Sequence, residues 1–310
     1  MHTPEVIETA DGSITCLDQS TGELYHNRAG AVAEAMHNFV RPLALQHWQT
    51  ERLRVLDVPF GLGYNTFVFL QEIFRTGKLN DLSNIEIVAI EQDRAVLSLT
   101  ERVLQDEKFS FLRESLGFSS GDDFADSVDP ISASRLRHFC QCLQDSSVYE
   151  TRVGKTHLSI TVQQGDMRTI VPMLADDGQH FDFIMHDPFS PNKMPELWTI
   201  DILQRYKQLL PPSGRLTTYS VAVAVRAALL QTGFSLYETT PVGAKSGGTL
   251  ATASPLTEIE TTCTNIPEEC LQRMHGRSGV PYRDPFFVLS RSEIRKNRIE
   301  EQDQFFPLEM

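Results

Sequence analysis

The sequence lacks the long apolar runs of membrane proteins. Its 310 residues are 41% hydrophobic and 22% charged, which is the composition of a folded globular protein. No apolar stretch reaches the roughly 20 residues that a membrane-spanning helix needs, and Met1–Gly12 has neither the basic start nor the apolar core of a secretory signal. We therefore expect a cytoplasmic protein with no membrane partner.

Cysteine is scarce and unfavourably spaced for metal binding. The chain has five, at Cys16, Cys140, Cys142, Cys263 and Cys270. No two are separated by the two-residue gap of common zinc sites, and no histidine pair flanks Cys140 and Cys142 at ligand spacing. We expect reduced thiols and no bound metal.

Positive charge is also in deficit, with 28 Lys and Arg against 41 Asp and Glu and a net charge of −13. This balance argues against a large non-specific nucleic-acid footprint but leaves room for a local basic face. Such a face is expected between Leu271 and Glu300, where Arg and Lys outnumber Asp and Glu. A solvated helix with surface ion pairs explains the same stretch equally well.

Short apolar runs alternate with helix-like segments over most of the chain. This order predicts an α/β fold of Rossmann-like type, with a central, mostly parallel sheet covered on both faces. The expected strands are Leu53–Val58, Ile85–Ile90, His157–Val162, Phe181–Met185 and Arg215–Tyr219, and the expected helices are Ala31–Leu45, Thr66–Phe74, Arg94–Leu104, Ala133–Leu143, Ile200–Leu210 and Val221–Gln231.

Three segments are expected along the chain. Residues 1–49 form an N-terminal extension of a hairpin and a helix, because turn signals at Asp11-Gly12 and Thr21-Gly22 bracket short strand-like pieces. Residues 50–260 form the core, with a helical insertion at about 105–155. Residues 261–310 form the basic C-terminal segment.

The first chemical signal is the turn that follows the first core strand. Glycines at Gly61 and Gly63 allow the backbone to approach a ligand closely. The third glycine of a dinucleotide fingerprint is replaced by Thr66, which disfavours a pyrophosphate. The shorter turn suits S-adenosylmethionine, which has no phosphate; a purely structural turn is the alternative. The candidate cofactor residues here are Asp57, Phe60, Gly61, Gly63 and Asn65.

Two further strand ends carry acidic residues. Glu91 can accept hydrogen bonds from both ribose hydroxyls of an adenosine, whereas Asp93 is expected to cap the next helix. After the third strand, Gly165 precedes Asp166, which is expected to bind the adenine amino group, and Met167, which is expected to pack on the ring. A helix cap is the alternative for Asp166.

The fourth signal is Asp187, placed by a buried strand at the carboxyl edge of the sheet. Pro188 and Pro191 stiffen the loop that follows. A carboxylate there can orient a substrate amine and accept its proton during methyl transfer. We expect Asp187 to be catalytic and, with Pro188, to lie beside the cofactor. A loop-stabilising aspartate is the alternative.

Several blocks resemble one known family, the tRNA 5-methylaminomethyl-2-thiouridine methyltransferases. The resemblance rests on His186–Trp198 (HDPFSPNKMPELW), Leu209–Tyr219, Val225–Phe234, the opening Gly22–Asn27 and Pro281–Pro285. The resemblance covers most of the chain. The chain is similar to the stand-alone form of this family, which lacks the FAD oxidase domain.

The resemblance implies S-adenosylmethionine as cofactor and the aminomethyl group on tRNA wobble uridine 34 as acceptor. The sequence leaves open whether a separate enzyme supplies the aminomethyl intermediate. Tyr25 and His26 are expected near the cofactor. The substrate is expected to lie against Phe189, Lys193, Trp198, Lys245 and Arg283.

Two other functions fit the same pattern. A polyamine aminopropyltransferase has a similar fold and a similar aspartate loop. A non-catalytic RNA-binding relative would keep the fold without turnover. The Pro-Glu-Leu-Trp block and the basic tail favour tRNA over polyamine, and the complete set of acidic strand ends favours catalysis.

Overall fold

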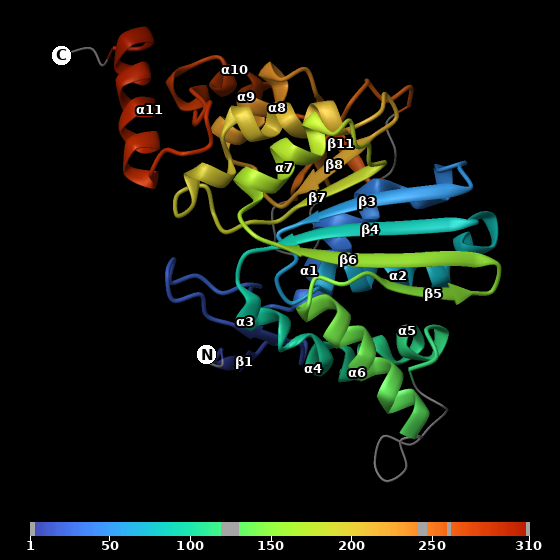
Figure 1. The fold of residues 1–310 in the computed structure, drawn as a ribbon. Coiled ribbons are helices and arrows are strands. Elements are labelled where there is room, and N and C mark those ends of the chain that lie inside the picture. Colours follow the sequence, from blue (N-terminus) through green and yellow to red (C-terminus); the bar gives the residue numbers. More distant parts are fainter. Residues whose placement is uncertain (1–3, 119–129, 241–246, 259–261, 308–310) are drawn as a thin grey trace. The chain divides into compact units, whose positions relative to one another are not determined.

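The computed structural model describes residues 4–118, 130–240, 247–258 and 262–307 (Figure 1). Two compact units share the chain. Unit 1 consists of Met1–Met36 and Ala44–Gly165, and unit 2 of His37–Leu43 and Asp166–Met310. The segment boundaries expected near residues 49 and 260 do not coincide with this division, and they remain a prediction.

Unit 1 is built on a sheet whose strands lie in the order β3-β4-β6-β5. The first three are parallel and β5 runs antiparallel at the edge. Leu53 lies opposite Ile85, which in turn lies opposite Leu158, so an apolar row crosses the parallel strands. The bounds are β3 (Arg52–Val58), β4 (Asn84–Glu91), β5 (Tyr149–Val153) and β6 (Thr156–Gln164).

Helix α2 (Tyr64–Arg75) lies behind this sheet in Figure 1. All of its residues except Glu72 and Arg75 are buried, because apolar side chains occur around its whole circumference. The other helices of unit 1 are α1 (Ala31–Ala35), η3 (Leu45–His47), η4 (Lys78–Asp81), α3 (Arg94–Leu97), α4 (Thr100–Gln105), η5 (Glu107–Phe109), α5 (Ser110–Ser115) and α6 (Pro130–Gln144).

Two helices differ from their expected form. The helix expected over Arg94–Leu104 is divided into α3 and α4, and the Ser98 hydroxyl at the break donates to the Ala95 carbonyl at 2.6 Å. The helix expected over Ala31–Leu45 begins as α1 and continues as a π-helical turn, η1 (Met36–Val40), and a 3-10 turn, η2 (Arg41–Leu43).

A small hairpin precedes these elements. Strands β1 (Val6–Glu8) and β2 (Ile14–Cys16) are antiparallel and are joined through Asp11. The Asp11 carboxylate accepts hydrogen bonds from the Ser13 amide at 2.9 Å and from the Thr9 hydroxyl at 2.8 Å. The turn signal read from the sequence therefore marks a real turn.

Unit 2 has a second set of strands. β7 (Phe183–His186) and β8 (Arg215–Thr218) are parallel, whereas β10 (Thr249–Thr252) is antiparallel to both β8 and β9 (Ser235–Thr239). β11 (Cys263–Asn265) closes this side, antiparallel to β9. The segment His37–Leu43 joins unit 2 because the Phe39 carbonyl accepts from the Thr217 hydroxyl at 3.2 Å.

The helices of unit 2 pack in a row in which α7 contacts α8, α8 contacts α9 and α9 contacts α10. The last helix, α11, stands apart from this row and contacts η6 (Figure 1). Their bounds are α7 (Met167–Asp176), η6 (Pro195–Leu197), α8 (Ile200–Leu209), α9 (Val223–Gln231), α10 (Glu268–Met274), η7 (Arg277–Gly279) and α11 (Arg291–Phe305).

The expected α/β class with parallel strands is confirmed. Each expected strand is present with its ends shifted by one or two residues at most, and antiparallel strands complete both sets. Within the residues that the structure describes, no helix is both long and apolar enough to cross a bilayer.

Candidate functional site

The turn between β3 and α2 is tightly packed around its two glycines. Gly61 and Gly63 have φ angles of +55° and +91°, a region that favours glycine. A Cβ on Gly63 would lie 2.6 Å from the Phe67 ring, and one on Gly61 would lie 3.3 Å from the Tyr25 ring. Glycine is therefore required at Gly63 by both torsion and space.

Asp57 is the next-to-last residue of β3 and has no exposed surface. Its Oδ2 accepts a hydrogen bond from the Thr66 hydroxyl at 2.7 Å, so Thr66 takes part where a fingerprint glycine would stand. Burial raises the pKa of Asp57 to about 8. Its Oδ1 is buried and has no hydrogen-bond partner among the described residues.

Glu91, the last residue of β4, is hydrogen-bonded to the glycine turn. Its Oε2 accepts from the Gly61 amide at 2.7 Å and its Oε1 from the Asp93 amide at 2.8 Å. Each oxygen keeps a second lone pair, as ribose binding would require. Burial raises the pKa of Glu91 to about 7. Asp93 caps α3 as expected, accepting from the Ala95 amide at 2.8 Å.

Tyr25 and His26 both lie in this part of unit 1. The Tyr25 ring contacts Gly61, and burial together with the nearby Glu91 carboxylate raises its pKa. His26 packs edge-on against Tyr64 at 4.8 Å, and burial lowers the pKa of its imidazole to about 4. His26 is therefore neutral at physiological pH. Of the other candidates here, Phe60 and Asn65 are buried beside the glycine turn.

A pocket of about 490 Å³ opens beside Tyr25. Its volume lies in the range of small-molecule sites. Asp18 and Asp93 line it together with Arg94, so its charged rim is more acidic than basic. The complete lining is Pro4, Glu5, Cys16, Leu17, Asp18, Gln19, Ser20, Tyr25, Asp93, Arg94, Ala95 and Val96.

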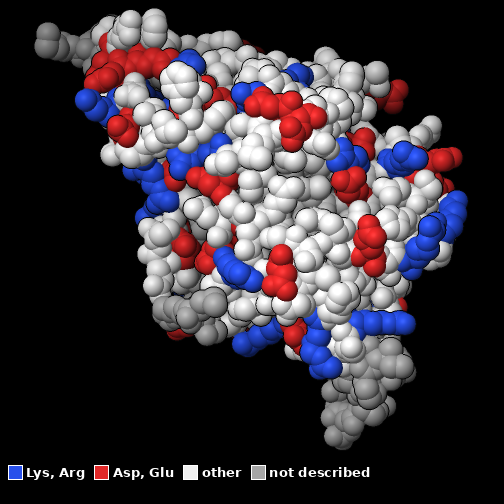
Figure 2. Space-filling view, in the orientation of Figure 1, with Lys and Arg blue, Asp and Glu red and all other residues white. Residues whose placement is uncertain are grey.

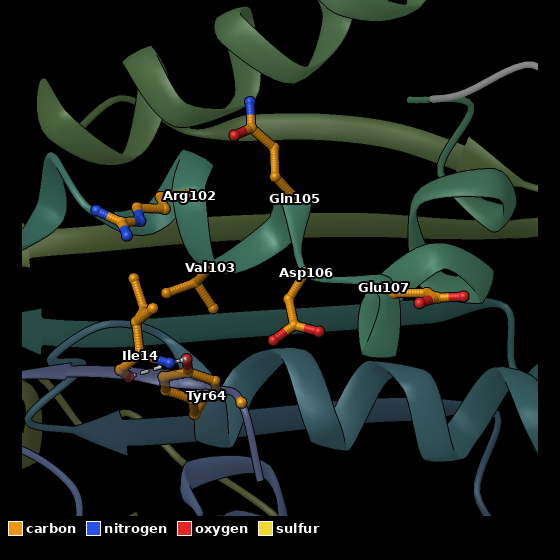
Figure 3. A pocket seen from close by; sticks show the side chains of 8 residues that line it. Ile14, Tyr64, Arg102, Val103, Gln105, Asp106 and Glu107 are labelled. Carbon is orange, nitrogen blue, oxygen red and sulfur yellow. Dashed lines mark hydrogen bonds between the residues drawn. The ribbon is translucent and has the colours of Figure 1, made fainter. Parts of the chain in front are cut away.

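A second pocket of unit 1, of about 310 Å³, lies between β2, α2 and α4 (Figure 3). The Tyr64 hydroxyl reaches its floor, where it donates to the Ile14 carbonyl and accepts from the Ile14 amide, both at 3.0 Å. Arg102 and Asp106 line the opposite wall (Figure 3). None of the candidate cofactor residues lines this pocket, so we assign it no part in catalysis.

In unit 2, Asp187 leaves β7 on a loop that neighbouring aromatic side chains hold in place. The Tyr219 hydroxyl donates to the Pro188 carbonyl and the Trp198 indole to the Phe189 carbonyl, both at 2.8 Å. Asp187 itself is half-buried. These two bonds fix the backbone of the loop directly after Asp187.

Trp198 is fully buried and also packs edge-on against His186 at 4.5 Å. This position does not favour the substrate contact expected for Trp198, because its ring supports the loop from inside. His186 is buried as well, which lowers its pKa to about 3, and its Nδ1 lies 3.1 Å from the Tyr206 hydroxyl. Tyr206 and Tyr219, which the sequence did not single out, complete this support.

Asp166 is the N-cap of α7 and also forms an ion pair with Arg168. Its Oδ1 accepts from the Arg168 amide at 2.8 Å, and its Oδ2 lies 2.9 Å from the Arg168 guanidinium. The capping alternative weighed for Asp166 is thus realised; binding of adenine remains a prediction. Gly165 donates to the Glu91 carbonyl at 3.0 Å, and Met167 is buried.

The remaining candidates differ in exposure. Lys193 is exposed and Phe189 is half-buried on the same loop. Arg283 pairs with Glu301 at 3.0 Å, so its charge is shared with an acid. Lys245 lies outside the described residues. Across the residues that are described, no cluster of His, Cys, Asp and Glu is arranged to hold a metal ion.

Comparison with known proteins shows what this arrangement resembles. Residues 128–254 match a family of S-adenosyl-L-methionine-dependent methyltransferases. The structure is similar to crystallised MnmC2 from Aquifex aeolicus, with a TM-score of 0.71 and 26% identity over 98% of this chain and 86% of that one.

Two sequence relatives extend the comparison. An uncharacterized protein of Methanocaldococcus jannaschii, MJ0670, is 27% identical over 96% of this chain and 72% of its own. The tRNA 5-methylaminomethyl-2-thiouridine biosynthesis bifunctional protein MnmC of Cupriavidus necator is 24% identical over 81% of this chain. The match covers 35% of that relative, so the chain spans about a third of the length of such bifunctional proteins.

The cofactor is therefore S-adenosylmethionine, and the glycine turn fits it, together with the buried Asp57 Oδ1 that has no partner among the described residues. In sequence and in structure, the chain is similar to S-adenosylmethionine-dependent methyltransferases of the MnmC type.

Proposed function

We propose that this chain methylates the amine of 5-aminomethyl-(2-thio)uridine at wobble position 34 of tRNA, forming 5-methylaminomethyl-(2-thio)uridine. The observation that carries the proposal is the Asp187 loop, whose backbone carbonyls are fixed by Trp198 and Tyr219. The name of the bifunctional relatives supports this acceptor. The acceptor amine requires an earlier reaction on the uridine.

Unit 1 would hold the adenosine. The second lone pairs of the Glu91 oxygens accept the ribose hydroxyls, while Gly61 and Gly63 leave room for the backbone to approach. Tyr25 lies against Gly61 and would form one wall. S-adenosylmethionine supplies the methyl group from its sulfonium centre when bound.

Unit 2 would act on the acceptor. Asp187 accepts a hydrogen bond from the amine and aims the nitrogen lone pair at the methyl carbon. On transfer of the methyl group from the sulfonium to the nitrogen, Asp187 would accept the proton that the nitrogen releases. Orientation contributes most of the rate in such an in-line transfer, and proton acceptance adds to it.

Incubation of purified protein with S-adenosylmethionine and tRNA that carries the aminomethyl group tests this proposal. Mass spectrometry of the digested nucleosides should show one added methyl group at position 34, and tRNA with unmodified uridine should gain none. Binding of the cofactor without methylation of this tRNA would contradict the proposal. Transfer of an aminopropyl group from the decarboxylated cofactor to a polyamine would favour the aminopropyltransferase instead.

A further inference from the structure

Two large apolar side chains stand exposed just before α11. Phe286 is 79% exposed and Val288 is 74% exposed, more than any other large hydrophobic residue in the described ranges. Burial normally stabilises a Phe side chain by about 1.5–3 kcal/mol, so an exposed ring contributes little to folding. The Phe286 ring is therefore available to a partner.

The turn that presents Phe286 is held rigidly. The Asp284 carboxylate, which has no exposed surface, accepts from the amides of Val288 at 2.9 Å and Leu289 at 3.1 Å. The Phe287 amide donates to the Asp284 carbonyl at 3.0 Å, and Phe287 adopts a left-handed φ of +59°. A ring on such a turn loses little conformational entropy when it binds.

The turn is also anchored to the body of unit 2. The Asp284 amide donates to the Asp201 carboxylate at 2.6 Å. Arg168 lies 3.5 Å from the Asp284 carboxylate and donates to the Leu289 carbonyl at 3.2 Å. Arg168 also pairs with Asp166, the N-cap of α7, so this arginine connects the turn that carries Phe286 to the start of α7.

Two cations without a carboxylate partner among the described residues lie side by side near the first turns of α11. Arg295, about one turn into α11, donates to the carbonyls of Asn192 at 2.6 Å and Lys193 at 3.2 Å rather than to a carboxylate. Lys193 is exposed. By contrast, Arg291 is neutralised by Glu196 at 2.6 Å. Figure 2 shows blue side chains, interspersed with red ones, beside the start of α11.

We infer that Phe286 is a stacking platform for an unpaired nucleobase of the RNA substrate, with Arg295 and Lys193 contacting its phosphates. The inference rests on the proposed function. Proteins bind single-stranded nucleic acid by combining exposed aromatic rings with positive charge, and each stacked base contributes about 1–3 kcal/mol. Two exposed side chains are too small an area for a stable protein interface.

The test measures tRNA binding and methyl transfer for Phe286→Ala, with Phe305→Ala as the matched control. Phe305 is 61% exposed at the other end of α11. Phe286→Ala should raise both the Kd and the KM for tRNA about tenfold. It should leave kcat and the Kd for S-adenosylmethionine within about twofold. Phe305→Ala should leave all four values unchanged.

Phe286→Trp gives a direct readout of stacking. The two natural tryptophans, Trp48 and Trp198, are buried, so the new indole would dominate the response to ligand. An anticodon stem-loop RNA should quench its emission, and a duplex without unpaired bases should not.

An unchanged Kd for tRNA in Phe286→Ala, or unquenched emission in Phe286→Trp, would overturn the inference, as would a complete absence of tRNA binding. Quenching by the stem-loop without any methyl transfer would contradict the proposed function and support the platform. Methyl transfer with no effect of Phe286→Ala would contradict the platform and support the proposed function.

Discussion

At the scale of single residues, Asp187 carries the chemistry of the proposed reaction. Asp187→Asn keeps the shape of the side chain and removes the proton acceptor. We expect the rate of methyl transfer to fall by roughly 10²–10⁴, the usual contribution of a positioned base. Calorimetry should show a Kd for S-adenosylmethionine within a few-fold of the wild type.

The control for this substitution is Asp176→Asn. Asp176 lies on α7, pairs with Arg205 and has a largely exposed side chain. It should leave the rate unchanged. A wild-type rate of methyl transfer in Asp187→Asn would show that the carboxylate takes no part in the reaction.

The two buried acids of unit 1 predict how its stability depends on pH. Burial raises the pKa of Glu91 from 4.5 to about 7 and that of Asp57 from 3.8 to about 8. At a pH between the ordinary pKa of each acid and its raised pKa in the folded state, the folded chain keeps a proton that the unfolded chain has lost. Stability should therefore fall as pH rises from about 4 to about 8, by up to about 1.4 kcal/mol per pH unit for each group.

Urea denaturation at several pH values measures this slope. Glu91→Gln should remove the part between pH 4.5 and about 7, and Asp57→Asn the part that extends to about pH 8. Slopes equal to the wild type in both variants would show that neither acid holds its proton in the folded state.

The sequence was sufficient to predict which residue types lie at the strand ends. It was not sufficient to predict the hydrogen-bond partners of every side chain there. The sequence indicated Asp93 as a cap, and the structure confirms it. It also indicated Trp198 as a substrate contact, although the indole points inward to a backbone carbonyl. A residue pattern shows which groups gather near a strand end; it does not show which face of the loop each side chain occupies.

At the scale of elements, the turn from β3 to α2 depends on Gly63. A Cβ at this position would add torsional strain at φ +91° and lie 2.6 Å from the Phe67 ring. Gly63→Ala should therefore destabilise the protein by roughly 2–4 kcal/mol, combining left-handed strain with overpacking.

Gly22→Ala is the matched control for Gly63→Ala. Gly22 has a similar φ of +70°, but a Cβ there would meet nothing within 4 Å. It should cost only the strain, about 1–2 kcal/mol. Equal losses in the two variants, measured by urea denaturation, would show that the Phe67 contact is relieved by small shifts.

Elements with a strong apolar pattern were predicted well, and those shaped by distant contacts were not. β4 and α2 match their expected ranges because apolar side chains fill them. The run from Ala31 to Leu43 changes from α to π to 3-10 geometry. There the Phe39 and Pro42 carbonyls accept hydrogen bonds from Thr217 and Arg215, which are more than 170 positions away in the sequence. A local sequence pattern cannot predict contacts between such distant residues.

At the scale of the whole molecule, the sequence predicted the methyltransferase class because acidic residues follow successive strands in one order. It did not predict that the chain forms two compact units that divide at Gly165, and it left open whether the cations of the C-terminal segment are paired. Arg277 pairs with Asp303 and Arg283 with Glu301. Surface ion pairs, one of the two explanations offered for this segment, are present and leave Arg295 without a carboxylate partner in the described part of the chain; the RNA-facing role stays a prediction.

A molecule with a net charge of −13 can bind tRNA only through a small patch of such unneutralised cations. The dependence of the binding constant on salt should then be shallow, corresponding to a few phosphate contacts. Lys193→Gln combined with Arg295→Gln should reduce the slope of log K against log salt by about 2. Lys155→Gln, an exposed lysine between β5 and β6, should leave it unchanged. A steep slope that neither substitution alters would place the phosphate contacts elsewhere on the molecule.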